Sequence, residues 1–357
     1  MTVRTYLDHA ATTPVCPEAR EAMLLALDRW ANPSSPHSEG RTARAALEQA
    51  RATVAEALSW RHDVIFTSGA SEAVDIAARR ARVSGRVVGA TEHEVVPHAM
   101  GAGAQILPVG EDGLIDMVAL DQQLDGPPAL FAIQHVNNET GVIQPLKEIF
   151  GRISSAGSLL LADCAQSAGK LDLPSADFIA VSAHKLGGPP GVGALLVRDL
   201  AMIEPSGGQE KGYRRGTQDL PGVLGMAAAL KAGPFRAAMP RIAELRRKLD
   251  LGVRAAGGIV VAEGSPRIAN IGAVALPGAS KAGLLVQFDL AGIALSAGSA
   301  CASGKMKESH VLNAMRVDAS IASSFLRVSF GPATTEADVE RFLSEWRRIA
   351  ERRSAAA

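Results

Sequence analysis

The stretch DFIAVSAHKLGGPPGVGALLVR, residues 177–198, places a histidine and a lysine directly after an apolar run. DFIAVS predicts a buried strand, the glycine- and proline-rich segment predicts a turn, and GALLVR predicts a second buried strand. Lysine is rarely buried without a partner. Lys185 is therefore either a solvated residue at a strand end or a partly desolvated amine that can form a Schiff base. This stretch alone leaves both interpretations open.

Similar apolar runs alternate with amphipathic stretches over most of the chain. Near-continuous apolar strands that alternate with helices predict an α/β fold with a mostly parallel sheet flanked by helices. The other predicted strands lie at 63–70, 86–91, 104–110, 128–136, 158–165 and 193–198, and the predicted helices at 43–58, 71–82 and 145–157.

The pattern changes after residue 233. A long amphipathic helix is predicted at 240–256 and a last helix at 335–353, with apolar runs at 269–277, 283–292 and 325–331 between them. We therefore expect a large α/β domain at 14–236 that binds the cofactor. A smaller α+β domain is expected from residues 1–13 and 237–357.

The composition excludes several classes of protein. The 357 residues include 37 basic and 37 acidic side chains and only 4% aromatic residues, which argues against nucleic-acid binding. No apolar run could span a bilayer, and the first residues lack the apolar core of a signal peptide, so we expect a cytoplasmic protein without membrane attachment. Three scattered cysteines predict neither a disulfide framework nor a metal site.

Polar residues follow the predicted strands one after another. In open α/β sheets ligands bind at the carboxyl ends of the strands. Ser71 opens a helix, where free backbone N–H groups could hold a phosphate, although a simple helix cap is the commoner role. His93 follows the next strand, where a surface histidine is the commoner case. Asn137 and Asn138 precede Gly141 and are also typical of an ordinary turn.

The combination of these residues is more informative than any one of them. Asp163 ends an apolar strand, where a carboxylate is costly unless it meets a cation or a donor. A carboxylate facing a ring nitrogen, a Schiff-base lysine such as Lys185 and a phosphate cradle are what pyridoxal 5′-phosphate (PLP) requires. His93 could stack on the ring. The set therefore predicts a PLP site.

The sequence resembles the cysteine desulfurases, within the class V group of PLP-dependent enzymes. The matching segments span nearly the whole chain in order: YLDHAATTP, NPSSPHSEGR, FTSGASEA, TEHEVV, HVNNETGVIQP, ADCAQSAGK, SAHKLGGPPGVGAL, RRGTQDLPG, SAGSACASG and LRVSFG. This resemblance implies the PLP-dependent transferase fold type I. It also implies conversion of L-cysteine to L-alanine, with transfer of the sulfur to an acceptor protein such as an iron–sulfur scaffold.

The resemblance also implies roles for individual residues around the cofactor ring. Lys185 would form the Schiff base with PLP, and Asp163 would pair with the pyridine nitrogen. Gln166 would bind the ring hydroxyl. His93 would stack on the ring and assist proton transfer, and either the released Lys185 or His93 would take the proton from the substrate Cα atom.

Further residues are implied to bind the cofactor phosphate. Within one subunit these are Ala70, Ser71, Ser182 and His184. Thr217, in the motif RRGT, would reach the phosphate of the neighbouring subunit, which implies a homodimer.

The remaining implied residues concern the substrate. Asn138 would contact the cofactor and the substrate, and Arg327 would bind the substrate carboxylate, which suits a guanidinium. Cys301 lies among glycine, alanine and serine residues that are typical of a mobile loop. Cysteine is often simply buried, but SAGSACASG resembles the desulfurase type with a long active-site loop, so Cys301 would attack the substrate sulfur as a thiolate. Cys16 and Cys164 lack such a setting.

The sequence departs from the family pattern at several positions. His9 stands where the family often has asparagine, so contacts near the ring could differ. Ser71 replaces the usual threonine and keeps the hydroxyl, and Pro332 replaces a common arginine. The chain is also shorter than many relatives between RRGT and SAGSAC. The segment KMKES after Cys301 could add charge for docking an acceptor, although a solvated loop is the simpler interpretation.

Two other functions remain open at this point. An aminotransferase, a selenocysteine lyase or a cysteine-sulfinate lyase would need the same lysine, aspartate and phosphate cradle, but not Cys301 in that loop. A scaffold that has lost catalysis would have no reason to keep Lys185, Asp163, His93 and Gln166 together.

Overall fold

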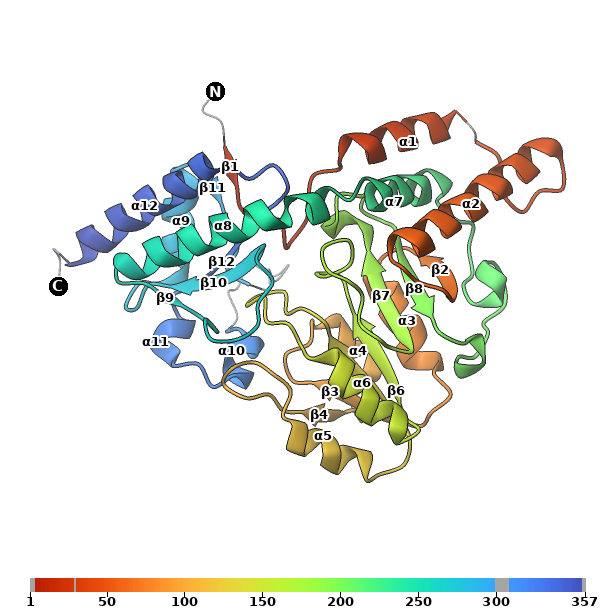
Figure 1. Cartoon of the computed structure of the whole chain (residues 1–357), viewed down its shortest axis with the longest axis horizontal. Helices are drawn as coiled ribbons and strands as arrows, with labels where there is room; N and C mark the ends of the chain where they lie inside the picture. The colour runs from red at the N-terminus through yellow and green to blue at the C-terminus, as the bar shows by residue number, and fades with distance from the viewer. Residues whose placement is uncertain (1–3, 29, 299–307, 355–357) are drawn as a thin grey trace.

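The structure is a computed structural model that describes residues 4–28, 30–298 and 308–354. Cys301 therefore lies outside the described residues. Figure 1 shows a large sheet with its helices on one side of the molecule and a smaller group of strands and helices on the other. Helix α8 (Pro234–Ala255) runs from the large part across the smaller one.

A seven-stranded sheet forms the large part, in the order β2-β8-β7-β6-β5-β3-β4. Strand β8 is antiparallel to both of its neighbours, and all other pairs are parallel, which confirms the predicted mostly parallel sheet. The strands are β2 (Asp63–Thr67), β3 (Gly85–Gly89), β4 (Gln105–Leu107), β5 (Ala129–Gln134), β6 (Leu159–Asp163), β7 (Phe178–Ser182) and β8 (Gly193–Val197).

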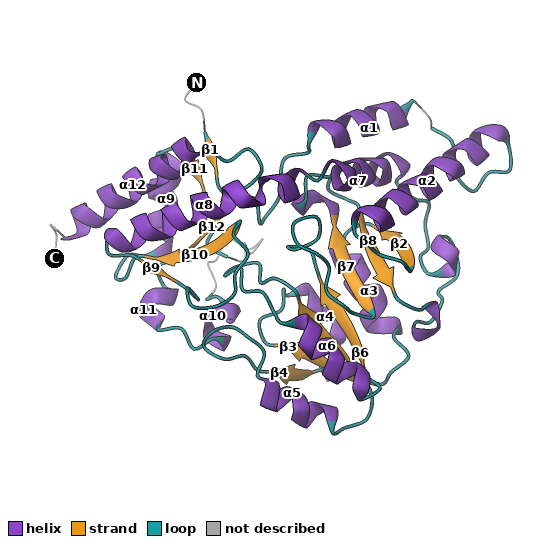
Figure 2. Ribbon diagram, viewed as in Figure 1, coloured by secondary structure: helices purple, strands orange, loops and turns teal. Residues whose placement is uncertain are grey.

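Helices cover both faces of this sheet, as Figure 2 shows. Side chains of β5 alternate between the two apolar layers: Phe131 and Ile133 join one, Leu130 and Ala132 the other. This explains why the strands are apolar along their whole length. One layer includes α2 (Ser38–Ala57), α5 (Met117–Leu124), α6 (Leu146–Ser155) and α7 (Leu220–Ala232), with α1 (Pro17–Leu27) against α7; the other includes α3 (Ala70–Arg80) and α4 (Val95–Met100).

The smaller part combines two short sheets with helices. A three-stranded antiparallel sheet has the order β12-β10-β9, and β1 pairs in parallel with β11. The remaining elements are β1 (Thr5–Tyr6), β9 (Ile259–Val260), β10 (Ile271–Ala275), β11 (Ile293–Ala294), β12 (Phe325–Ser329), α9 (Lys281–Leu290), α10 (His310–Ala314), α11 (Ala319–Ala322) and α12 (Glu336–Ser354), and the 3-10 turns are η1 (Ala183–Lys185), η2 (Leu200–Met202) and η3 (Glu210–Gly212).

The core of the smaller part centres on aromatic rings. Phe288 of α9 stacks on Phe342 of α12 with ring centroids 4.9 Å apart, and Trp346 follows at 5.7 Å from Phe342. The apolar run at 283–292 is thus mostly helix α9. The predicted domain boundary at residue 236 falls in the first turn of α8, and the division into two domains stays a prediction.

Candidate active site at the carboxyl ends of the strands

A cavity of about 450 Å³ lies at one edge of the large sheet. Strands β2, β5, β6 and β7 all point their carboxyl ends toward this edge, because β2 and β7 are both antiparallel to β8. The residues that follow these strands are therefore brought together, as predicted. The cavity is lined by Ala10, Ala11, Ser68, Gly69, Ala70, Ser71, His93, Val95, Gln134, Val136, Asn138, Asp163, Ala165, Gln166, Ser182, His184, Lys185, Pro190, Gly191, Gly298 and Arg327.

Lys185 ends the 3-10 turn η1 directly after β7, and its side chain lines this cavity. Burial lowers the pKa of its amine to about 8, opposed by the nearby Asp163 carboxylate. Arg327 also lowers this pKa, and Asp8 raises it. The amine is therefore neutral, as a nucleophile requires, in a much larger fraction of molecules near neutral pH than an ordinary lysine would be. The structure supports the desolvated lysine rather than the solvated one.

The glycine-rich turn after Lys185 permits a close approach of two chain segments. A side chain at Gly193, the first residue of β8, would come within 2.7 Å of the Gly69 Cα atom and 2.4 Å of the Val181 carbonyl oxygen. Only glycine can pass here without moving the backbone beside the cavity.

Asp163 and Gln166 occupy the next strand end. Asp163 is the last residue of β6, and its Oδ1 atom accepts a hydrogen bond from the Ala165 backbone N–H at 2.9 Å. Gln166 is buried, and its Nε2 atom donates to the Ala10 carbonyl at 2.9 Å. Its Oε1 atom has no hydrogen-bond partner among the described residues. A buried polar atom of this kind indicates room for a polar ligand group.

Two histidines of the cavity are neutral near neutral pH. Burial, followed by the positive Lys185, lowers the pKa of His93 below its usual value. The same two causes lower the pKa of His184 to about 4, and its Nδ1 atom lies 3.1 Å from the Thr12 hydroxyl. A neutral His93 can accept a proton, which fits its predicted role.

The predicted phosphate residues come from two neighbouring places: Ala70 and Ser71 lie at the start of α3, and Ser182 and His184 lie at the end of β7 and in η1. Ala70 begins helix α3, and the preceding Gly69 provides no side-chain cap. Ser71 and Ser182 line the same cavity. Free N–H groups at a helix start and two hydroxyls suit a phosphate. Thr217, in contrast, is exposed and is not part of the cavity wall.

Arg327 enters the cavity from β12 of the smaller part. Its Nη2 atom pairs with the Asp8 carboxylate at 2.9 Å, and its Nη1 atom donates to the Asn138 carbonyl at 3.1 Å. The side chain is only 5% exposed, and its Nε atom has no hydrogen-bond partner among the described residues. A buried, oriented guanidinium is suited to binding a carboxylate.

A buried carboxylate joins the two described ends of the segment that contains Cys301. Glu139 accepts a hydrogen bond from the Ser309 hydroxyl at 2.5 Å. A Cβ atom built at Gly298 would lie about 3 Å from the same carboxylate. Next to Ser309, the Nε2 atom of His310 donates to the Glu92 carbonyl at 2.8 Å. Residues 298 and 309 thus both lie next to Glu139, and Gly298 also lines the cavity.

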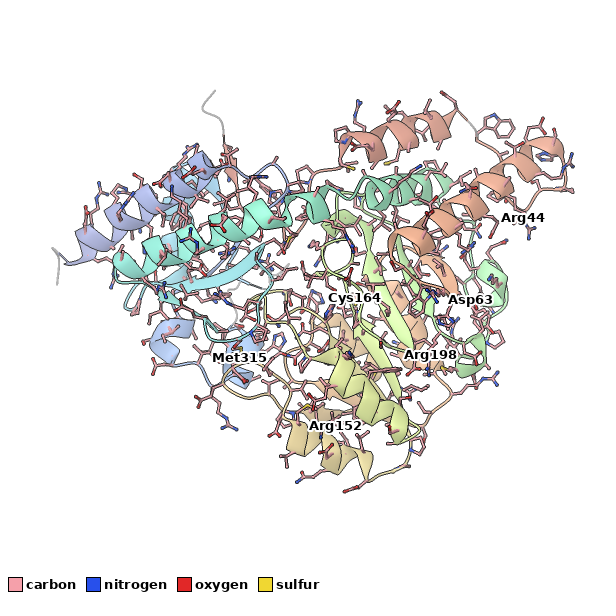
Figure 3. All side chains as sticks on the ribbon, viewed as in Figure 1. Arg44, Asp63, Arg152, Cys164, Arg198 and Met315 are labelled. Carbon is pink, nitrogen blue, oxygen red and sulfur yellow. The ribbon has the colours of Figure 1, made fainter. Side chains whose placement is uncertain are left out.

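The two cysteines that the structure describes are buried, Cys164 completely so. Burial raises the pKa of both thiols. Cys164 packs in the larger apolar core, in the middle of the molecule in Figure 3. Neither thiol is suited to nucleophilic attack.

Two of the departures from the family pattern are also placed. The His9 ring packs beside Tyr6, with centroids 4.9 Å apart, and against Gly331. His9 is not among the residues that line the cavity, although the next residue, Ala10, is, and the effect of His9 on contacts near the ring stays a prediction. The carbonyl of Pro332 accepts a hydrogen bond from Arg241.

The sequence analysis missed Asp8 and Glu92. Asp8, in the motif YLDHAATTP, is the partner of Arg327. Glu92 is fully buried beside His93, and burial raises its pKa well above the usual value. The sequence shows only that each of the two motifs contains an acidic residue. The fold was needed to show what each of these residues contacts.

The comparisons with known proteins agree with this geometry. The family model described as aminotransferase class-V matches residues 5–342. The chain belongs to this family. Its members are PLP-dependent, and the predicted resemblance and fold type are thereby confirmed.

Individual relatives with similar sequences include cysteine desulfurases. The chain is 37% identical to the IscS-like cysteine desulfurase of Mycobacterium tuberculosis and 35% identical to a cysteine desulfurase of Cereibacter sphaeroides, in each case over 95% of this chain and 94% of the relative. The solved structure of a NifS-like protein from Rickettsia africae superposes with a TM-score of 0.91 at 28% identity, covering 98% of this chain and all of that one.

The residues present fit PLP, the cofactor of this class V family. Lys185 provides an amine for the aldehyde, Asp163 a carboxylate for the ring nitrogen, and the start of α3 a site for the phosphate. Gln166 also lines the cavity, and its Oε1 atom, which has no hydrogen-bond partner among the described residues, is free to bind a polar group of the cofactor.

Proposed function

We propose that the chain is a PLP-dependent cysteine desulfurase that converts L-cysteine to L-alanine and carries the released sulfur as a persulfide on Cys301. One observation carries this proposal. Of the ten predicted cofactor residues, all except Thr217 line one cavity, together with Arg327 and with Gly298, three residues before Cys301.

When bound, PLP supplies an electron-withdrawing ring that stabilises negative charge on the substrate Cα atom. Arg327 binds and orients the substrate carboxylate, assisted by Asn138. Asp163 would face the ring nitrogen of the cofactor with its side chain. Lys185 and His93 both line the cavity and have lowered pKa values, so each can accept the Cα proton.

The sulfur step is balanced without an external oxidant. The thiolate of Cys301 attacks the substrate sulfur, the Cβ–S bond breaks, and an S–S bond forms. The electron pair of the broken bond stays with the substrate, whose Cβ atom takes up a proton to give alanine. Gly298 lines the cavity, and three residues of extended chain span at most about 11 Å, so the sequence places Cys301 within reach of it.

The comparisons support this activity over the alternatives, because the relatives reported above carry the name cysteine desulfurase. The acceptor of the sulfur is proposed to be a protein such as an iron–sulfur scaffold, as the sequence resemblance implies. In the described part of the chain, no helix has the length and apolar character needed to cross a membrane. The cytoplasmic location stays a prediction.

We also propose a homodimer. Thr217 lies outside the cavity of its own subunit and is exposed, so a second copy can place it at the partner's phosphate site. Large apolar side chains that a dimer could cover are exposed near α1: Leu24, Leu25, Leu27 and Trp30, the last of them 85% exposed.

The test measures alanine and sulfide together, with L-cysteine and a reductant as the only additions to the purified holoenzyme. The wild type should form both in equal amounts, and Cys301→Ser should form almost none. Cys16→Ser is the matched control, because Cys16 is a buried thiol outside the cavity and should retain full activity. A Cys301→Ser variant as active as the wild type would exclude the persulfide route.

A further inference from the structure

The segment 207–218, which ends just after Thr217, has an unusual backbone. Six of its residues have positive φ angles, and two of these are not glycine: Glu210 at 50° and Lys211 at 57°. The glycines are Gly207, Gly208, Gly212 and Gly216. A left-handed backbone conformation is unfavourable for a residue other than glycine, so it persists only where the surroundings fix it.

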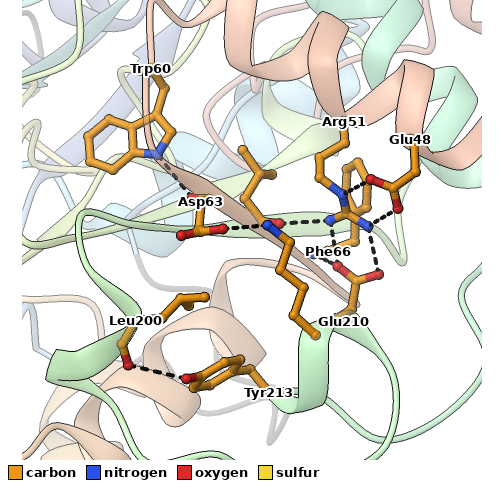
Figure 4. A network of polar contacts seen from close by, with 10 residues as sticks. Glu48, Arg51, Trp60, Asp63, Phe66, Leu200, Glu210 and Tyr213 are labelled. Atoms are coloured by element: carbon orange, nitrogen blue, oxygen red, sulfur yellow. Dashed lines mark hydrogen bonds and ion pairs between the residues drawn. The ribbon is translucent and has the colours of Figure 1, made fainter.

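The Glu210 side chain provides that fixation. Its carboxylate is completely buried and accepts hydrogen bonds from two Arg51 nitrogens, Nη1 at 2.7 Å and Nη2 at 3.2 Å. It also accepts one from the Phe66 backbone N–H at 2.8 Å and one from Gln218 Nε2 at 2.7 Å. Figure 4 shows the Glu210 carboxylate beside the Arg51 guanidinium, with Glu48 on the other side of that guanidinium. One buried side chain thus connects α2, strand β2 and the residue next to Thr217.

The other contacts of Arg51 make the network rigid. Its guanidinium lies over the Phe66 ring, 4.8 Å from the centroid, and Nη1 also donates to the Val64 carbonyl at 2.7 Å. Glu48, the second carboxylate on Arg51, is 52% exposed and belongs to the rim of the network. Glu210 is therefore the member whose charge is buried and whose bonds reach the strand.

A second connection leads to the same place. Arg214, in the same segment, pairs with Glu72 in the first turn of α3 at 2.9 Å. The other Glu72 oxygen accepts a hydrogen bond from the Ser68 backbone N–H at 2.5 Å. Ser68 lines the cavity next to the predicted phosphate residues. The segment is thus attached to both sides of the 68–71 turn: to β2 through Glu210 and to α3 through Arg214.

We infer that Glu210 is a positioning residue for phosphate binding in both subunits of the proposed dimer. In its own subunit it fixes the strand that leads into the 68–71 turn. Through Gln218 it holds Thr217 in the orientation needed by the partner's cavity. This inference rests on the proposed dimer. It means that one buried carboxylate, that of Glu210, supports the phosphate sites of both subunits.

The first experiment measures the affinity for PLP, by the visible absorbance that appears when apoenzyme is titrated with the cofactor. Glu210→Gln should weaken binding by about 10- to 100-fold, the range expected for loss of one or two hydrogen bonds to a charged group. Gln218→Ala, which removes only the connection to Thr217, should weaken binding to the same extent as Thr217→Ala. Glu48→Gln is the matched control and should stay within twofold of the wild type.

Sedimentation velocity and circular dichroism establish that each variant is folded and dimeric. If Glu210→Gln does not fold, Gln218→Ala alone still decides the question, since its side chain is at the edge of the network. A folded, dimeric Gln218→Ala with wild-type affinity would overturn the role assigned to Glu210 in placing Thr217.

Hybrid dimers separate the effect of Glu210 on the phosphate site of its own subunit from its effect on the phosphate site of the partner subunit. In a hybrid, one subunit carries Lys185→Ala, so only the other subunit can develop the absorbance of lysine-bound cofactor. Glu210→Gln is then placed in either subunit. Weaker binding in both arrangements is expected. If the substitution acts only in the binding subunit, the role toward the partner is wrong; if it acts in neither, the whole inference is wrong. Failure of the PLP-loaded wild type to form alanine would instead refute the desulfurase proposal and leave this inference untouched, because PLP affinity is measured without L-cysteine.

Discussion

Lys170 is a buried amine that the proposed reaction does not use, and replacing it tests the electrostatics of the protein interior near Lys185. The side chain is 3% exposed, and its Nζ atom has no hydrogen-bond partner among the described residues. It lies over the Phe235 ring, 4.8 Å from the centroid. Burial, followed by the positive Lys185, lowers the pKa of Lys170 to about 7. Lys170→Met keeps the unbranched stem and removes the amine.

The lowered pKa of Lys170 determines the size and the sign of the change in the free energy of unfolding. An unfolded lysine titrates near 10.5, so at pH 7 the native state loses about 4 kcal/mol relative to an unperturbed amine, at about 1.4 kcal/mol per pKa unit. The contact with Phe235 offsets about 1–2 kcal/mol of this cost. We therefore expect Lys170→Met to raise the free energy of unfolding by about 2–3 kcal/mol at pH 7.

The gain should become smaller as the pH rises. Between pH 7 and 10.5 the unfolded wild type binds a proton at Lys170 that the folded wild type lacks, so the stability of the wild type increases with pH. The variant lacks this increase, and its advantage should fall by about 2 kcal/mol between pH 7 and pH 9.

Urea unfolding at pH 7 and pH 9 measures both effects. Protein and PLP concentrations are kept equal, because ligand binding and association change the apparent stability. Lys231→Met, at an exposed lysine of α7, is the control and should change little at either pH. A Lys170→Met variant that is less stable than the wild type, or whose advantage is the same at both pH values, would contradict the reasoning.

Three further predictions concern single side chains. Arg327→Lys should raise the KM for L-cysteine about 10- to 100-fold, because an ammonium cannot reproduce the bidentate geometry; an unchanged KM would show that the carboxylate binds elsewhere. Cys164 should resist iodoacetamide in the native protein and react in urea, as peptide mass spectrometry can measure, since burial raises its pKa; rapid native labelling would contradict this. Ser309→Ala removes the cap of α10 and the bond to Glu139, and should lower the free energy of unfolding by about 1–2 kcal/mol in urea titrations. No change in that free energy would mean that the bond contributes nothing to stability.

The strand ends were the most predictable part of the molecule. Each apolar run of the large sheet is a strand, and the residues just after several of these runs meet in one cavity because parallel strands end at a common edge. Lys185, Asp163 and His93 could therefore be grouped from local patterns alone. Short elements such as β1 and β11 have two residues each and provide no pattern of their own, so they became visible only through their pairing.

The acidic residues that hold the site together were not predictable in the same way. Glu210 bonds to Phe66, 144 positions away along the chain, and Glu139 bonds to Ser309, 170 positions away. In the sequence both are ordinary acids in loops rich in glycine or asparagine, and nothing local distinguishes a buried carboxylate from a solvated one. A buried carboxylate differs from a solvated one because it needs hydrogen-bond donors from the protein in place of water. The chemistry at strand ends thus follows from local order, whereas the rigidity of these ends depends on contacts that only the folded chain can supply.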